Sequence, residues 1–314
     1  MATFRIRYWE YINTRCPMNK GIFELLQYDF FTSALWASVL ASISCGIAGS
    51  YIVARRMVFV SGGITHASFG GIGIAWFLGI NPVLGAAVFS IFTALGIEFF
   101  TTRTKIREDS AIGIWWSLGM ALGIIFIFIT PGYAPNLMSF LFGSILTVSH
   151  TDLWLMGGLS VLLIFVFMRY YHLILFISFD EAYARSHQAP VSFFKYLLIT
   201  LVALTIVLNI RVAGIILVIS FLTIPPSIAN LFTHSMVKVM AGAVVAGLLG
   251  SITGLIASYY FNIPSGATII FAFVLMFAIA KVIQRLMIQA EMRTQLGAHR
   301  ERVNSKKDAS LRSE

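Results

Sequence analysis

Long apolar stretches separated by short polar turns run along most of this 314-residue chain. A helix needs about 20 apolar residues to cross the hydrocarbon core of a bilayer, and each stretch has about this length. We read nine of them, at about 30–54, 62–80, 82–101, 110–130, 152–170, 193–209, 212–232, 237–260 and 265–285. The pattern predicts an all-α, polytopic integral membrane protein, a permease-type bundle of eight or nine transmembrane helices.

The composition supports this prediction. Hydrophobic residues make up 58% of the chain and charged residues 11%, whereas about a quarter of the residues in a soluble domain are charged. The formal net charge is +9, but the bases are spread among turns and a polar C-terminal tail. This distribution is typical of anchoring to membrane lipids, and we expect no nucleic acid as a partner.

Basic residues gather in alternate turns, and this sets the orientation. They are Arg55, Arg56, Arg103, Lys105, Arg107, Arg169, Arg185, Lys195, Lys238, Lys281 and Arg285. The intervening turns hold only Arg211. We therefore expect the basic turns and the C-terminus to be cytoplasmic, with the N-terminus outside if all nine stretches cross.

One integral domain, residues 30–285, is the simplest partition. Residues 1–29 precede it, and 1–17 resemble neither a secretory signal nor a span, so Met18 is an alternative start. A polar cytoplasmic tail, 286–314, follows. Residues 131–151 are too broken by proline and glycine for a span, and we expect a short helix at the outer surface, either a gate or partner site or an interfacial helix without a special role.

The second apolar stretch carries an imidazole, His66, deep among small residues. Two rows recur along it, one of Gly63, Ala67, Gly71 and Ala75 and one of Gly62, His66, Gly70 and Gly73. The first row permits close approach of another helix. Imidazole is a common ligand of divalent transition metals, so His66 is the candidate metal ligand, with Ser61, Thr65 and Gly70 lining a pathway. The alternative is a core histidine bonded to a neighbouring helix.

Two further segments are candidates for function. Residues 179–188 interrupt the apolar pattern with acids early and bases late, which favours a short amphipathic helix that docks a soluble partner, or else an ordinary solvated loop. Its candidate coupling residues are Asp180, Glu181, Ala182, Ala184 and Arg185. Pro225 and Pro226 are expected to break their span and to line the pathway, or to form a static kink.

Other polar residues and motifs are assigned no role. We expect Glu98, Glu108 and Asp109 to be interfacial and solvated. The chain has no G-x-x-x-x-G-K-[ST] phosphate loop, no H-E-x-x-H and no G-x-S-x-G, so nucleotide hydrolysis belongs to another chain and no catalytic residue or bound cofactor is expected. Cys16 and Cys45 are too few for a disulfide framework or a metal cluster.

Several segments, taken in order, resemble a known family. They are Arg55, Arg56 and Met57, then Thr65, His66 and Ala67, then 109–114, 141–146, 180–182, 212–225 and 263–267. Together they resemble the membrane-spanning permease subunits of ABC importers for zinc, manganese and iron, from about residue 30 to 285. The resemblance implies a homodimeric permease in a bacterial cytoplasmic membrane, two ATPase subunits that use ATP, an extracytoplasmic metal-binding protein, and a coupling loop near 173–192.

One departure from the family pattern bears on the substrate. The family has an aspartate four residues before the histidine, and this chain has Gly62 there. A site of two imidazoles without a carboxylate binds a dication less strongly and less selectively. A permease for iron chelates or cobalamin is therefore the main alternative, followed by an ATP-independent secondary transporter and, last, a membrane-embedded enzyme.

Overall fold

In the computed structural model, the described residues are 29–104, 106–131, 143 and 148–311. Within these ranges the chain forms helices and no strand, which confirms the all-α prediction. The helices are α3 (Asp29–Ala54), α4 (Val58–Phe77), α5 (Pro82–Arg103), α6 (Glu108–Ile129), α8 (His150–Arg169), α9 (Tyr171–Phe179), α10 (Glu181–Ser186), α11 (Val191–Ala213), α12 (Ile215–Asn230), α13 (Met236–Phe261) and α14 (Ser265–Leu311).

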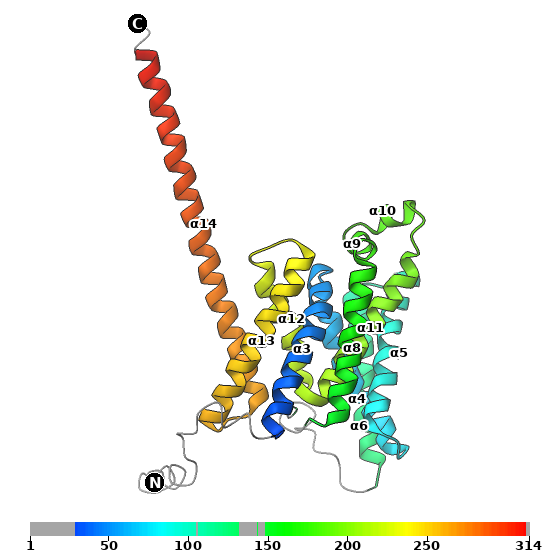
Figure 1. Ribbon diagram of the computed structural model, residues 1–314. Helices are drawn as coiled ribbons and strands as arrows, with labels where there is room; N and C mark the ends of the chain where they lie inside the picture. The colour runs from blue at the N-terminus through cyan, green and yellow to red at the C-terminus, as the bar shows by residue number, and fades with distance from the viewer. Residues whose placement is uncertain (1–28, 105, 132–142, 144–147, 312–314) are drawn as a thin grey trace, which may run out of the picture.

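The long helices form an up-and-down bundle (Figure 1). Eight of the described helices are long and apolar enough to cross a membrane, and α12, with 16 residues, is shorter, about 24 Å in length. The loop between α12 and α13 lies at the same end of the bundle as α9 and α10, and α3 begins at the opposite end (Figure 1). We call the end with α9 and α10 the basic face, because the arginine-rich and lysine-rich turns lie there.

A single residue, Gly214, separates α11 from α12. The sequence predicts that the sixth span ends near residue 209, but α11 continues to Ala213. Gly214 then turns the chain with φ 80° and ψ 164°, a conformation that is essentially restricted to glycine. The turn at the end opposite the basic face is therefore sharp enough for α12 to start at the next residue.

The prediction that Pro225 and Pro226 break their span is wrong, because α12 runs through both residues to Asn230. The second proline removes the N–H partner of the Leu222 carbonyl. That carbonyl faces α3 at Gly49, where an added Cβ would lie 2.4 Å from the oxygen. Protein atoms therefore cover the freed carbonyl, and this lets the helix continue inside the bundle.

The small residues of α4 pack it tightly between α5 and α6, as the sequence predicts for the row that contains Gly71. An added Cβ at Gly71 would lie 2.1 Å from the Gly85 carbonyl oxygen of α5. An added Cβ at Gly73 would lie 2.5 Å from the Gly123 carbonyl oxygen of α6. At these positions the helices touch backbone to backbone, so even alanine would force them apart.

The last helix, α14, extends far beyond the bundle at the basic face (Figure 1). Its membrane-crossing part is Ser265–Ala290, and the helix continues without interruption to Leu311. The expected polar tail thus begins as an extension of this helix. Residues 1–28 with Met18 and Cys16, Lys105, and most of the surface helix expected at 131–151 lie outside the described residues.

Candidate functional site

His66 lies in the middle of α4, about 12 Å from the start of the helix at Val58. Its side chain is half-buried. The imidazole stacks on the indole of Trp116 in α6, with ring centroids 4.4 Å apart and planes 6° from parallel. The stack sets the plane of the imidazole, and the side chain stays partly accessible.

The hydroxyls near His66 are occupied by their own helix. Ser61 Oγ donates to the Val58 carbonyl at 2.7 Å, and Thr65 Oγ1 donates to the Ser61 carbonyl at 2.5 Å. Both side chains are buried. Gly62 differs from them, because an added Cβ there would meet no atom within 4 Å. There is thus room for a side chain one helical turn before His66, where the family pattern has its aspartate.

The other residues predicted to line a pathway are buried in helix contacts. Gly70 lies against α6, and an added Cβ would be 2.7 Å from the Gly119 carbonyl oxygen. Pro225 and Pro226 are buried within α12, a helix that packs on α4. The assignment of these residues to a pathway stays a prediction.

No cluster of three or more His, Cys, Asp or Glu side chains that could hold a metal ion occurs in the described part of the chain. Within these ranges His66 therefore belongs to no group of three or more such side chains. A complete coordination sphere at this position would need ligands from a second chain, from water or from the cargo itself.

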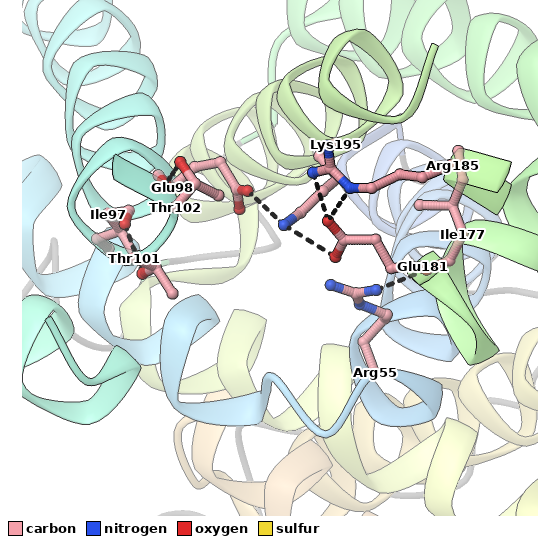
Figure 2. Close-up of polar contacts among 9 residues, drawn as sticks. All are labelled: Arg55, Ile97, Glu98, Thr101, Thr102, Ile177, Glu181, Arg185 and Lys195. Atoms are coloured by element: carbon pink, nitrogen blue, oxygen red, sulfur yellow. Dashed lines mark hydrogen bonds and ion pairs between the residues drawn. The ribbon is translucent and has the colours of Figure 1, made fainter. Parts of the chain in front are cut away.

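A charge cluster at the basic face joins three helices (Figure 2). We define it as Glu98 of α5, Glu181 and Arg185 of α10, and Lys195 of α11. Lys195 Nζ lies 2.9 Å from Glu98 Oε1 and 3.3 Å from Glu181 Oε2, and Arg185 Nη2 lies 2.7 Å from Glu181 Oε1. The Glu98 oxygen meets Lys195 outside hydrogen-bonding geometry, so this contact is an ion pair without a hydrogen bond.

The prediction that Glu98 is solvated is wrong. Its side chain is 8% exposed, and that of Lys195 is 12% exposed. The packing of α5 against α11 covers both groups. Asp109 is exposed, as predicted, and pairs with Arg107 at 3.5 Å, whereas Glu108 is half-buried.

The short helix predicted within 179–188 exists as α10. The Asp180 carboxylate caps it by accepting from the Tyr183 backbone N–H at 2.8 Å. Ala184 is buried against Ile177 and Phe194, which holds the helix to the bundle, while Ala182 is exposed. Arg55 Nη1 also donates to the Ile177 carbonyl at 2.7 Å, so the turn after α3 supports the base of this segment.

The charges around Glu181 keep its carboxylate ionised. Partial burial raises the pKa, but the hydrogen bond from Arg185 and the charge of Lys195 outweigh it, so the pKa of Glu181 lies below its usual range. The carboxylate therefore bridges two cations at neutral pH. Through Lys195, α10 is tied electrostatically to the buried end of α5.

Sequence reasoning missed three contacts. Two of them are ion pairs, Glu98 with Lys195 at 2.9 Å and Asp152 with Arg211 at 3.1 Å. In each pair a lone acid and a lone base lie at the ends of apolar stretches that are predicted to reach the same face of the membrane. This pattern could have been used to predict the pairs. The third contact, Trp116 on His66, had no signal, because a tryptophan in a span is common.

A comparison with known proteins decides the family. The model of the ABC 3 transport family matches residues 27–284. The chain belongs to this family. The match covers all the membrane-crossing helices except the last few residues of α14 and confirms the resemblance to ABC metal importer permeases.

Known proteins are similar to this chain over most of their length. An uncharacterized membrane protein of Synechocystis sp. is 43% identical over 82% of this chain and 92% of its own length. The manganese transport system membrane protein MntC of Halalkalibacterium halodurans is 34% identical over 82% and 88%. The solved structure of PsaBC from Streptococcus pneumoniae in complex with Fab matches with a TM-score of 0.74 and 31% identity, covering 83% of this chain and 95% of that chain.

Proposed function

We propose that this protein is the transmembrane permease subunit of an ATP-driven importer of divalent transition-metal ions in a bacterial cytoplasmic membrane. Among manganese, zinc and iron, manganese is favoured by the relatives named as manganese transport proteins. The observation that carries the proposal is the half-buried imidazole of His66, held at mid-membrane depth on Trp116 and beside the open space at Gly62.

The proposed working unit is a homodimer. Its axis would pass along the α4–α6 surface, where two copies of His66 would meet and complete a site that one chain does not build. The α6 helix supports this arrangement, because only 22% of its apolar stretch is buried by the rest of the chain. This is the smallest buried share among the candidate spans. Such a poorly covered helix needs lipid or a second copy of the chain against it.

Power would come from two cytoplasmic ATPase subunits, and the metal would be delivered by an extracytoplasmic binding protein. The proposed contact with the ATPase is α10, because Ala182 is exposed while Ala184 anchors the helix to the bundle. The basic face is then cytoplasmic, in agreement with the distribution of basic residues. Alternating access would follow from movement of α10 that reaches α5 through the charge cluster.

A metal chelate is a second candidate substrate, and the empty position beside Gly62 favours it. A chelate brings its own ligands and needs room rather than a carboxylate. A bare ion has no ligands of its own and needs them from the protein. The two substrates therefore differ in how much they depend on the imidazole of His66.

The test is uptake by proteoliposomes that contain the permease with the ATPase and the binding protein from the same genome. We expect ATP-dependent uptake of manganese, competed by zinc and iron, and His66→Ala should lower it at least about tenfold, a loss of 1.4 kcal/mol. His66→Gln keeps a polar side chain of similar size and serves as the matched control. ATPase assembly should be unchanged in both variants.

The outcomes separate the candidates. Uptake of a metal chelate that is unaffected by His66→Ala, with no uptake of the free ion, would assign the protein to chelate transport. Flux driven by an ion gradient without ATP would contradict the whole proposal.

A further inference from the structure

A large apolar groove opens at the basic face, away from His66 and the charge cluster. It lies between α3, the junction of α8 with α9, and the first turns of α13, and its volume is about 1040 Å³. Ligand-holding clefts in proteins range over roughly 300–1,000 Å³. The groove is therefore large enough to hold a substantial ligand.

The walls and the rim of the groove differ in chemistry. Aliphatic side chains such as Ile47, Met168 and Val244 form the walls. At the end nearest the basic face, the lining changes to Arg169, Tyr170 and His172. This arrangement suits an amphiphilic ligand, whose apolar body would lie along the helices and whose polar head would lie at the membrane surface.

The rim carries positive charge that no described residue neutralises. Arg169 is exposed, its guanidinium lies 5.3 Å from the centroid of the Tyr170 ring, and it has no ion-pair partner among the described residues. Across the groove, the N-cap residue of α13, Ser235, makes no side-chain cap, and Val237 of the first turn lines the groove. The next residue, Lys238, is not part of the lining but brings a second positive charge to the same helix end. The Arg169 guanidinium and the start of α13, with Lys238 next to it in sequence, together favour an anionic head group.

We propose that this groove binds an anionic phospholipid of the cytoplasmic leaflet, with its acyl chains along α3, α8 and α13 and its phosphate between Arg169 and the start of α13. The cytoplasmic leaflet is the anionic one, and basic pockets between transmembrane helices on that side bind such head groups. A zwitterionic lipid would neutralise less of the rim charge. The proposal uses the orientation of the chain and does not depend on the transported substrate.

The test measures lipid retained by the purified full-length protein. The protein is reconstituted in nanodiscs of phosphatidylcholine with phosphatidylglycerol, transferred to mild detergent, and examined by native mass spectrometry. We expect phosphatidylglycerol to be retained in preference to phosphatidylcholine. Arg169→Gln and Lys238→Gln should each lower its retention by about fivefold, and Ala241→Phe, which fills the groove, should lower the retention of both lipids.

Two matched variants control for general effects. Arg103→Gln removes an exposed cation from the same face at the end of α5, and Val88→Phe enlarges an exposed apolar residue of α5 outside the groove. Neither should change lipid retention.

Three results would overturn the proposal. If Arg103→Gln lowered phosphatidylglycerol retention as much as Arg169→Gln, the effect would come from the overall charge of this face and not from the groove. Equal retention of the two lipids by the unmodified protein would remove the anionic preference. Loss of dimer mass in Ala241→Phe without loss of lipid would assign the groove to a second copy of the chain.

Discussion

The charge cluster at the basic face and the surroundings of His66 are both polar places in an apolar bundle, yet they are built in opposite ways. In the charge cluster every charged group has a partner from another helix or from the next helical turn, and Lys195 serves two carboxylates. His66 has an aromatic ring on one side and belongs to no cluster of three or more potential metal ligands within the described residues. The charge cluster is fully paired, whereas the described residues give His66 no set of three ligands for a metal.

The difference separates groups that hold the fold from groups that are available to a ligand. A buried ion pair is expensive to break, because the group left behind is charged and desolvated. Removal of a half-buried imidazole that stacks on an indole should cost the fold little stability. Mutations in the two places should therefore affect different measurements, stability in the first and transport in the second.

The largest effect is expected from Lys195→Met. It leaves Glu98 buried and unpaired, and breaking a buried pair in this way costs about 3–5 kcal/mol. The midpoint of thermal unfolding in detergent should fall accordingly. The double variant Glu98→Gln with Lys195→Met removes both charges and should recover most of the loss. A double variant that is as unstable as Lys195→Met would show that the pair does not account for the stability.

A smaller effect is expected from Gly71→Ala, because its Cβ would meet the backbone of α5 at 2.1 Å. Overpacking of this kind costs about 1–3 kcal/mol. Gly62→Ala is the matched control on the same helix, where the added Cβ meets open space. Thermal unfolding of the two variants compares tight packing with open space next to His66. Equal destabilisation by both would contradict the distinction.

Ala182→Asp tests the exposed side of α10 without touching the charge cluster. If this side enters an apolar groove of the ATPase, a buried unpaired charge should weaken the complex by at least about tenfold, or 1.4 kcal/mol. Copurification with the ATPase measures the effect, and Ala182→Ser is the control of similar size. Unchanged thermal unfolding with full retention of the ATPase would exclude docking at this position.

The smallest effect is the pH dependence of the attachment of α10. Because the pKa of Glu181 is lowered in the folded protein, its contribution is fully present above the unfolded pKa and is lost as the pH falls through the folded pKa. Glu181→Gln should remove this acid-range loss and lower stability by a few tenths of a kcal/mol at neutral pH. Unfolding midpoints from neutral to acid pH measure both. An identical acid profile in the variant would contradict the assignment.

The approximate positions of the spans, their order and the basic face could be predicted from the sequence, because hydrophobic length and the position of arginine and lysine are local properties. The count stayed at eight or nine, and it is α12 that falls short of the length of the other eight. The short helix α10 and the tight row of α4 were also predictable from charge order and small-residue spacing. The continuation of α12 through Pro225 and Pro226 was not, because it depends on Gly49 of a distant helix covering a freed carbonyl.

The candidate site divides in the same way. The sequence alone singled out His66 as the deep imidazole, and the resemblance to the family singled out Gly62 as the position where a carboxylate is missing. Only the tertiary structure decided that Trp116 stacks on that imidazole, that Gly62 faces open space, and that Glu98 is buried against Lys195. These contacts join residues of different helices, and the hydrophobic pattern that places each helix in the membrane does not fix which of its faces meets which neighbour.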